Sequence, residues 1–565
     1  MKKNIVYTWC VVLLMGLCVA FIIGTMERWY EVLVYDKKWM LGFFFGFMLV
    51  CVCLVYGYNK YFSGNRTYFL GRERGFLRKQ EVRRKGFGSA GFGNVLRNDV
   101  LRNRVFWGVL LGVALGIRIV WVVMVPPPPP ISDFGLYYDW AEKFAHGEML
   151  GVEENNYIAL FPHVIGLPAV LMVLFKVFGA SLQLVTLFNA VVSTLTIGIV
   201  YAIGKRLMGR RWGRIAAVMM VFYPPNILFC SLVGTEILHQ AMFCCCIWVL
   251  AYAAQMSDTS ARQSARQSAR QPAHQSSQSS QSSQSARQSS QSSNRGAAAS
   301  GKVFWKQCVL MAVFGVLMEV SNGIRPMSAL LILAVLFCLI FFMRKNMKNL
   351  RKAAVMCGIM LAAYVMTGMM IQGVIEKTVE RPIARGDMGY TLAVGMKGGW
   401  NAEDMEMTLQ YGREESAKEA HKKMQEVAWQ RIQEDPAGVL GLMVKKTRDM
   451  WCDDTAAGMW LQWSYADEKS GLEVPENLIG RTGWVTMIMF YDYLLLLILM
   501  IFGLGNMIRE KEFNPSIFFV IVILGAVAAF CLVESQGRYR FFVAPLMMLL
   551  AAQAFRGKGK MGETC

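Results

Sequence analysis

Long runs of apolar residues, separated by short polar segments, recur along the whole chain. A helix needs about 20 consecutive apolar residues to cross the hydrocarbon core of a bilayer, and many of these runs approach that length. The pattern predicts an all-α polytopic membrane protein with about twelve transmembrane helices. The predicted spans are 6–24, 39–58, 105–125, 182–203, 214–230, 237–255, 303–321, 327–343, 353–373, 484–504, 514–533 and 540–555.

The first two spans lie within residues 1–59 and precede the other ten. The first follows Met1-Lys2-Lys3 and resembles a signal peptide. Because a second span follows after a short loop, we expect the first span to be retained as an anchor.

One further segment, 158–178, is apolar enough to span but contains Pro162 and Pro168. A full crossing here would move the strongly basic loop around 205–214 to the outer side, against the preference of basic loops for the cytoplasm. Since both prolines also break a helix, we expect this segment to lie at the outer face or to dip into it.

The distribution of charged residues indicates on which side of the membrane each loop lies. Residues 60–104 hold 12 Lys/Arg, and further basic groups crowd 205–214, 344–352 and 556–560, which places these loops and both termini in the cytoplasm. Residues 374–482 instead carry 19 acidic and 14 basic residues, which fits the opposite face. The formal net charge of +20 is therefore explained by inner loops that meet anionic lipid headgroups, and nucleic acid is not an expected partner.

The sequence predicts seven regions. They are two extra N-terminal transmembrane helices (1–59), a basic cytoplasmic loop (60–104), the first part of the membrane core (105–256) with its first outer loop (126–181), a disordered Ser/Gln/Arg cytoplasmic linker (257–302), the continued membrane core (303–373), an extracytoplasmic domain (374–482) and the C-terminal transmembrane helices (483–565).

The extracytoplasmic segment is long enough to form a small, mainly helical domain. Residues 411–433 alternate charged and apolar positions at helical spacing, which predicts one amphipathic helix, and a second helix is expected over 436–451. His421 is expected on the surface of the first. Five tryptophans cluster in this segment and suit either stacking on sugar rings or a cap resting on the membrane interface; these are Trp400, Trp429, Trp451, Trp460 and Trp463.

The positions of cysteine and histidine argue against a disulfide scaffold and against a metal site with regular ligand spacing. Nearly all of the 14 Cys lie in apolar spans, so no disulfide scaffold is implied. The five His are scattered without the spacing of a metal site. No cofactor is required by the sequence, although a divalent metal remains an open alternative.

Ionisable side chains gather at the outer ends of separate spans. Asp133 lies on the loop that leaves the third span, Glu236 and Arg325 lie at later outer turns, and Arg538 and Arg540 open the last span. Charged groups at membrane depth are costly and usually face a cavity or each other. A carboxylate that accepts a hydroxyl proton, together with guanidinium groups that hold a phosphate, would suit group transfer from a phosphorylated lipid.

The order of several motifs is recognisable. ISDFGLYYDWA, LFPHVIGLPAVLMVLFKVFGAS, SLVGTEILHQ, GIRPMSALL and GRYRFFVAPLMMLLAA follow one another along the chain. This order resembles the C-type glycosyltransferases of family 39, the superfamily of dolichyl-phosphate-mannose protein mannosyltransferases and aminoarabinose transferases. The resemblance covers roughly residues 105–555 without the Ser/Gln/Arg tract.

The resemblance implies roles for particular residues. Asp133 matches the general base of the first outer loop, but Phe134 follows it where the family often has a second acid, so Asp139 is a weaker candidate for that helper role. Glu236 matches an acid that orients substrate or assists a metal, and Arg538 an arginine that neutralises the lipid phosphate. Arg325, Arg540 and His163 complete the candidate substrate-binding set.

The implied reaction is inverting transfer of a sugar from a polyprenyl-phosphate carrier to a hydroxyl acceptor outside the cytoplasm. The acceptor is a protein, a lipid or a glycan, and membrane lipids surround the enzyme. The expected location is the bacterial plasma membrane, with the active site facing outside. Two alternatives stay open, a lipid-linked glycan flippase or polymer exporter and a non-enzymatic membrane scaffold.

Overall fold

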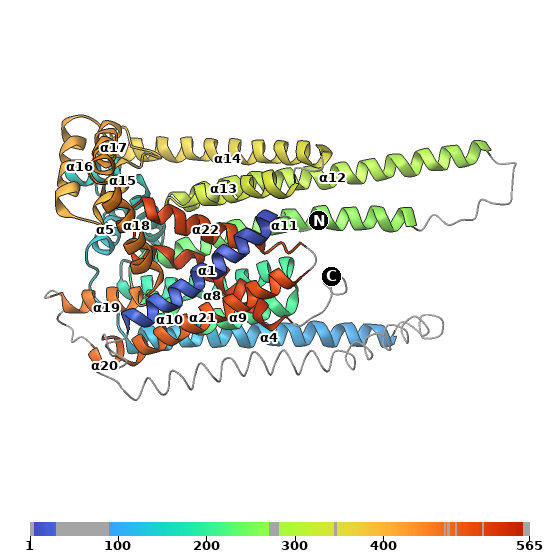
Figure 1. Ribbon diagram of the computed structural model, residues 1–565, viewed down its shortest axis with the longest axis horizontal. Helices are drawn as coiled ribbons and strands as arrows, with labels where there is room; N and C mark the ends of the chain where they lie inside the picture. Colours follow the sequence, from blue (N-terminus) through green and yellow to red (C-terminus); the bar gives the residue numbers. More distant parts are fainter. Residues whose placement is uncertain are drawn as a thin grey trace.

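The computed structural model describes residues 5–29, 90–269, 282–343, 347–467, 471, 475–480, 483–510 and 513–556. Within these ranges the regular structure is helical. Figure 1 shows an elongated molecule, with α5 and α15 to α19 gathered at one end and the long helices α4 and α12 extending toward the other. The second predicted span, 39–58, and most of the basic loop 60–104 lie outside the described residues.

The helices that build the membrane core are long and mostly apolar. Among the described residues, seven are long and apolar enough to cross a membrane, and two bent pairs raise the number to nine if each counts as one span. The helices that carry these seven candidate spans are α1 (Ile5–Arg28), α4 (Ala90–Met124), α8 (Leu182–Leu207), α11 (Glu236–Ala269), α12 (Ser282–Asn322), α14 (Met347–Val379) and α21 (Trp484–Arg509). The all-helical membrane fold is confirmed, whereas the count of twelve is not.

Three predicted spans are shorter or more broken than expected. The span predicted at 327–343 is α13 (Ser328–Cys338), continued by a π-helical turn, and the span predicted at 514–533 is α22 (Ile517–Leu532). The last predicted span consists of the 3-10 helices η6 (Gly537–Val543) and η7 (Ala552–Phe555) on either side of α23 (Ala544–Ala551). Apolar composition alone therefore overestimated the length of regular α-helix at these places.

The segment predicted to avoid a straight crossing is sharply bent. Helix α6 (Val152–Leu160) meets the pair η2 (Pro162–Ile165) and α7 (Gly166–Phe178) at 112°. Pro162 stands at this break, as expected. Pro168 was expected to break the helix too, but it lies in the first turn of α7, where the missing N–H has no intrahelical partner to lose.

A second bend separates α9 (Arg210–Phe222) from α10 (Pro224–Leu228), at 60°. The break leaves carbonyl groups at the end of α9 without intrahelical donors. Arg118, fully buried on α4, supplies them: its guanidinium donates to the carbonyl oxygens of Met220 and Val221 at 3.4 Å. It also donates to Ser193 Oγ at 2.6 Å.

Replacing Arg118 by Met should therefore destabilise the protein by about 2–3 kcal/mol, because buried carbonyls would lose their donor. The measurement is the thermal unfolding midpoint in detergent. Val120→Ala, on the exposed face of the same helix, is the matched control and should leave the midpoint nearly unchanged. An Arg118→Met midpoint equal to that of the control would show that the capping contacts contribute little.

The Ser/Gln/Arg linker is not disordered throughout. Helix α11 continues to Ala269 and α12 begins at Ser282, so helix covers 257–269 and 282–302, while residues 270–281 lie outside the described ranges. Ala, Gln and Arg have high helix propensity, and a helix already formed in a span extends readily into such residues. Figure 1 shows these extensions at the end away from α15 to α19.

The outer domain, defined here as α15 to α19, contains more breaks than predicted. Its helices are α15 (Gly389–Lys397), α16 (Ala402–Glu414), α17 (Ala417–Glu434), α18 (Pro436–Trp451) and α19 (Ala456–Ala466). The single helix expected over 411–433 is divided because Ser416 caps α17, accepting a hydrogen bond from Glu419 N at 3.2 Å. Asp435 caps α18 in the same way, and α18 begins and ends where the second helix was expected.

His421 is buried rather than on the helix surface, because it joins α17 to two other segments. Its Nδ1 accepts a hydrogen bond from Tyr390 N at 3.4 Å, and its Nε2 donates to the carbonyl oxygen of Leu160 at 3.0 Å. One ring nitrogen accepts while the other donates, so the ring is neutral. Burial lowers the pKa of His421 below its usual value, and this effect outweighs the hydrogen bond to Leu160, which acts in the opposite direction.

This geometry predicts that the outer domain loses stability in acid. The pKa of His421 in the folded state is below its unfolded value of about 6.5. The contribution of His421 to the free energy of unfolding is therefore fully present above pH 6.5 and is lost as the pH falls toward the folded-state pKa. The unfolding midpoint of the wild type should drop more between pH 7.5 and 5.5 than that of His421→Gln, whose amide keeps a donor and an acceptor but does not titrate. Equal drops would contradict this role of His421.

The five outer-domain tryptophans do not act as one group. Trp451 and Trp460 are buried, whereas Trp400, Trp429 and Trp463 are at least half exposed. Neither a sugar-stacking cluster nor a membrane-facing cap therefore describes the whole set.

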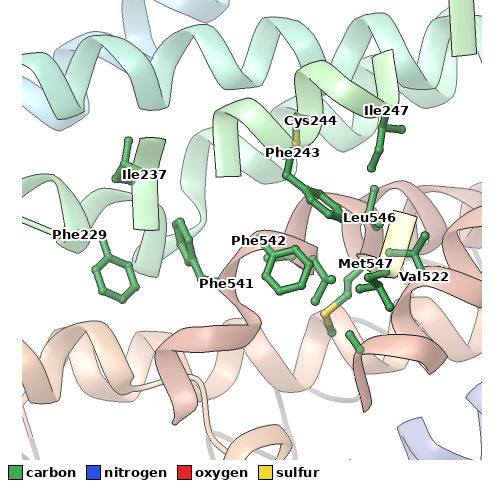
Figure 2. Packing of buried hydrophobic residues seen from close by; sticks show 14 of the residues in the cluster. Phe229, Ile237, Phe243, Cys244, Ile247, Val522, Phe541, Phe542, Leu546 and Met547 are labelled. Carbon is green, nitrogen blue, oxygen red and sulfur yellow. The ribbon is translucent and has the colours of Figure 1, made fainter. Parts of the chain in front are cut away.

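A dense apolar core lies next to η6 and α11. Figure 2 shows Phe541 and Phe542 of η6 packed against Phe229 and Phe243. The ring centroids of Phe229 and Phe541 are 4.8 Å apart, and those of Phe243 and Phe542 are 4.7 Å apart. This packing fixes η6 against α11, so the polar residues at the outer ends of these two elements have fixed relative positions.

Candidate functional site

Glu236 is the centre of a buried polar cluster at the ends of core helices that were predicted to face outward. It is the first residue of α11, and its Oε1 accepts a hydrogen bond from Arg325 Nη2 at 2.6 Å. Arg538 Nη1 lies 3.8 Å from the same oxygen. The Glu236 side chain is 1% exposed, so both guanidinium groups meet the carboxylate away from bulk water. Two arginines from opposite parts of the chain thus share one counter-ion.

Asp133 completes the cluster from the first outer loop. It is the first residue of α5 (Asp133–His146), and its Oδ2 lies 2.9 Å from Arg538 Nη2. Its side chain is 35% exposed, whereas that of Arg538 is 4% exposed. Asp133 is therefore the accessible carboxylate of the cluster, and Arg538 is a buried cation between two acids. The preceding residue, Ser132, has φ of 52°, a conformation that costs energy for any residue other than glycine.

Aromatic rings hold the Arg538 guanidinium in place. Its central carbon lies 4.3 Å from the ring centre of Trp460 on α19 and 5.3 Å from that of Phe134. Arg325 in turn lies 4.8 Å from the ring of Tyr539. Such cation–π contacts are attractive and strongest where water is excluded. The nitrogens of the Arg538 guanidinium meanwhile meet the oxygens of Asp133, Glu236 and Gln536.

A chain of hydrogen bonds through Gln536 and Glu534 also holds the Arg538 side chain. Its Nε donates to Gln536 Oε1 at 2.8 Å, and the Gln536 amide donates to Glu534 Oε1 at 2.8 Å. Burial raises the pKa of Glu534 above the usual carboxyl value. Glu534 N also donates to the carbonyl oxygen of Thr391, which connects this support to α15 of the outer domain.

Two glycines permit close approaches at the site. A Cβ placed on Gly234 would lie 2.2 Å from Glu236 Oε2, and one placed on Gly166 would lie 2.1 Å from the carbonyl oxygen of Gly323. Larger residues at either position would displace the carboxylate or the turn that carries Arg325.

His163, on η2, belongs to the surroundings of the same cluster. Burial lowers its pKa to about 4, and the nearby positive charge of Arg325 adds to the shift. His163 is therefore neutral at physiological pH. It can offer hydrogen bonds to a polar ligand but no positive charge for a phosphate.

Asp139 lies apart from the cluster. It follows Asp133 by six residues on α5, which rotates it by about 240° around the helix axis, and it is exposed. It therefore does not stand in for the second acid that the resemblance led us to expect.

Arg540 also lies apart, although it is buried. Its Nη2 donates to Asp454 Oδ1 at 2.8 Å and to the carbonyl oxygen of Asp453 at 2.6 Å. A 3-10 helix has three residues per turn, so side chains two positions apart in the sequence differ in direction by about 240° around the helix axis. Arg538 and Arg540 consequently face different partners, and Arg540 is not placed to bind the same ligand.

Several residues of these clusters were not predicted. Thr235 accepts a hydrogen bond from Arg325 Nε at 2.9 Å, and Trp460 covers Arg538. Tyr223 donates a hydrogen bond to Asp454 at 2.9 Å. Asp492 lies inside the apolar run of α21. Only Asp492 gave a usable signal, since an ionisable residue within a predicted span indicates a polar interior site.

Metal ligation has no obvious donor set among the described residues, where no group of three or more His, Cys, Asp or Glu is arranged around a common point. The strongest candidate acid, Glu236, already accepts from Arg325.

The cluster has the parts needed for transfer from a phosphorylated donor. A partly exposed carboxylate can accept a proton, and next to it a buried guanidinium offers paired donors to phosphate oxygens. The guanidinium keeps its charge at all relevant pH values. Asp133, Glu236, Arg325 and Arg538 come together here, with His163 close to them.

Sequence comparison agrees with this picture over part of the chain. Residues 163–262 match the family described as dolichyl-phosphate-mannose-protein mannosyltransferase. Residues 235–392 match a family described as protein chaperone-like protein of POR1-like. No curated protein matches the chain.

Two solved structures are similar at low level. The oligosaccharyltransferase AglB from Archaeoglobus fulgidus, in complex with an inhibitory peptide and a dolichol-phosphate, is 11% identical, with a TM-score of 0.39 over 80% of this chain and 50% of that one. ArnT from Cupriavidus metallidurans, bound to undecaprenyl phosphate, is 12% identical, with a TM-score of 0.29 over 79% of this chain and 77% of that one. The chain thus spans half of the archaeal protein.

The family match includes His163 and Glu236 and covers α8 to α10 between them. Over these residues the match supports the resemblance found in the sequence.

Proposed function

We propose that this protein is an inverting glycosyltransferase that moves a sugar from a polyprenyl-phosphate carrier to a hydroxyl acceptor at the extracytoplasmic face of a bacterial plasma membrane. One observation carries the proposal. The exposed Asp133 carboxylate lies 2.9 Å from the buried Arg538, which shares Glu236 with Arg325. A base and a phosphate-binding cation are thus adjacent.

In this proposal the donor phosphate binds at Arg538. Phosphate oxygens compete with Asp133 for Nη2, while Glu236 and the aromatic rings keep the guanidinium in position. Arg325 lies on the other side of Glu236 and adds positive charge. As the bond to the sugar breaks, the phosphate gains negative charge, and preorganised cations stabilise that change.

Asp133 acts as the general base once it is released from Arg538. It accepts the hydroxyl proton of the acceptor as the acceptor oxygen forms its bond to the anomeric carbon. The electron pair of the broken carbon–oxygen bond leaves with the polyprenyl phosphate. A single displacement of this kind inverts the configuration at the anomeric carbon.

The position of the cluster supports an outer active site. Figure 1 shows α5 at the same end as the outer domain, away from the long extensions of α11 and α12. Basic loops predicted to be cytoplasmic, such as 205–214, belong to the far ends of α8 and α9.

The test uses purified protein in lipid nanodiscs with radiolabelled short-chain polyprenyl-phosphate hexoses and pentoses, and a membrane extract as acceptor pool. Transfer of label with inverted anomeric configuration supports the proposal. Retention of configuration would exclude the single displacement. Movement of intact donor between leaflets of liposomes, without cleavage, would indicate a flippase instead.

A further inference from the structure

The short segment 452–455 connects three separate parts of the molecule. It joins α18, which ends at Trp451, to α19, which begins at Ala456, and it contains the adjacent acids Asp453 and Asp454. We call it the junction. Contacts from the junction lead to Arg538 by two routes and to α1 by a third.

The first route passes through Arg540. The main-chain oxygen of Asp453 and the carboxylate of Asp454 both accept from Arg540 Nη2, at 2.6 and 2.8 Å. The Arg540 side chain is 4% exposed, so water offers little alternative to these contacts. Arg540 and Arg538 belong to the same short 3-10 helix, η6. Holding Arg540 therefore holds the backbone that carries Arg538.

The second route passes through α19. Asp453 Oδ1 accepts from the backbone N of Thr455 at 2.9 Å and from its hydroxyl at 2.6 Å, which fixes the start of α19. The first residue of α19 also packs on η6, since a Cβ placed on Gly537 would lie 3.3 Å from Ala456 Cβ. One turn later, Trp460 lies over the Arg538 guanidinium.

The third set of contacts comes from α1. Arg28 Nε lies 3.0 Å from Asp453 Oδ2. One turn earlier, a Cβ placed on Gly24 would lie 2.5 Å from Cys452 Sγ, so only glycine allows the helix this close. The rings of Phe21 and Trp451 stack at 5.6 Å. Two turns of α1 thus pack along the end of α18 and the junction.

We propose that α1 and the junction form a brace that sets the position of Arg538, with Arg28, Asp453, Asp454 and Arg540 as positioning residues. The brace rests on the proposed function in that Arg538 is taken to bind the donor phosphate. Helix α1 is accordingly a part of the transferase core rather than only an anchor. A helix that served as an anchor alone would not need an ion pair to Asp453 or a glycine at its closest approach.

The experiment compares full-length variants in nanodiscs. Asp454→Asn removes the charge that holds Arg540, and Arg28→Gln removes the contact from α1. Arg448→Gln is the matched control, because Arg448 also links α18 to α1, through Glu27 at 3.3 Å, but both side chains are about half exposed. Arg28→Lys tests rescue by charge. Tyr223→Phe, which removes one hydroxyl from Asp454, replaces Asp454→Asn if that variant does not fold.

Three quantities are measured: the KM for the donor, kcat, and the dissociation constant of short-chain polyprenyl phosphate. Asp454→Asn should raise the KM and the dissociation constant together by about tenfold or more. A change of this size corresponds to the loss of about one hydrogen bond to a charged group. Arg28→Gln should raise both by a smaller factor, and Arg28→Lys should restore most of the loss. Arg448→Gln should change neither.

A lowered unfolding temperature with unchanged KM and dissociation constant would overturn the brace and leave these residues a purely structural role. If the wild type neither transfers sugar nor binds polyprenyl phosphate, the proposed function fails. The brace is then judged by hydrogen exchange in residues 537–543. Faster exchange in Asp454→Asn and Arg28→Gln, but not in Arg448→Gln, supports it, and equal exchange in all variants overturns it.

Discussion

Asp133→Asn should lower kcat by about 10²- to 10⁴-fold, the usual contribution of a positioned general base. The amide is nearly isosteric with the carboxylate but accepts no proton at neutral pH. It can still accept a hydrogen bond from Arg538, now 2.9 Å from Asp133 Oδ2, so the fold and donor binding should change little. Single-turnover transfer from a labelled donor measures the chemical step, and polyprenyl-phosphate affinity is measured in parallel.

Asp139→Asn is the control on the same helix. Asp139 is exposed on another side of α5, and its variant should transfer sugar at nearly the wild-type rate. If Asp139→Asn lost activity while Asp133→Asn kept it, the assignment of the base would be wrong. Loss of donor binding in Asp133→Asn, with an unchanged chemical step, would give Asp133 a binding role instead.

Arg538→Gln should have the largest effect on donor binding. The substitution removes the cation that meets the phosphate and also takes a partner from Asp133 and Glu236. Truncating one member of a buried charge pair typically costs 2–5 kcal/mol, which corresponds to about a 30-fold or greater loss of affinity for polyprenyl phosphate. Equilibrium binding of a fluorescent short-chain polyprenyl phosphate measures it.

Arg538→Lys separates charge from geometry. Lysine keeps the positive charge but lacks the planar fork and the stacking on Trp460. Its affinity should fall between those of the wild type and Arg538→Gln. Wild-type affinity in Arg538→Gln would exclude Arg538 from the phosphate site, and Arg325 would then be the cation to examine.

The sequence led to the site through topology rather than motif. Asp133, Glu236, Arg325 and Arg538 were chosen because each is an ionisable residue at the outer end of a predicted span, and they come together. The rule worked because buried charges need counter-charges, so isolated ones at the same depth tend to meet. It could not separate Arg538 from Arg540, because their different directions follow from the 3-10 geometry of η6.

Other features depend on contacts between distant segments and left no local signal. The pairing of Arg28 with Asp453 joins residues more than four hundred positions apart. The bend after Phe222 is stabilised by Arg118 from another helix, and hydropathy recorded only an apolar run there. The seven clear spans were predictable from composition, while the broken ones depended on prolines, caps and distant donors.

The most direct test is the structure of the protein with a non-transferable polyprenyl-phosphate sugar analogue, determined by electron cryomicroscopy in nanodiscs. The proposed mechanism predicts that the phosphate contacts the Arg538 guanidinium, that the 2.9 Å pair between Asp133 and Arg538 opens, and that Asp133 faces the anomeric carbon. A phosphate bound elsewhere, with the Asp133–Arg538 pair intact, would contradict it.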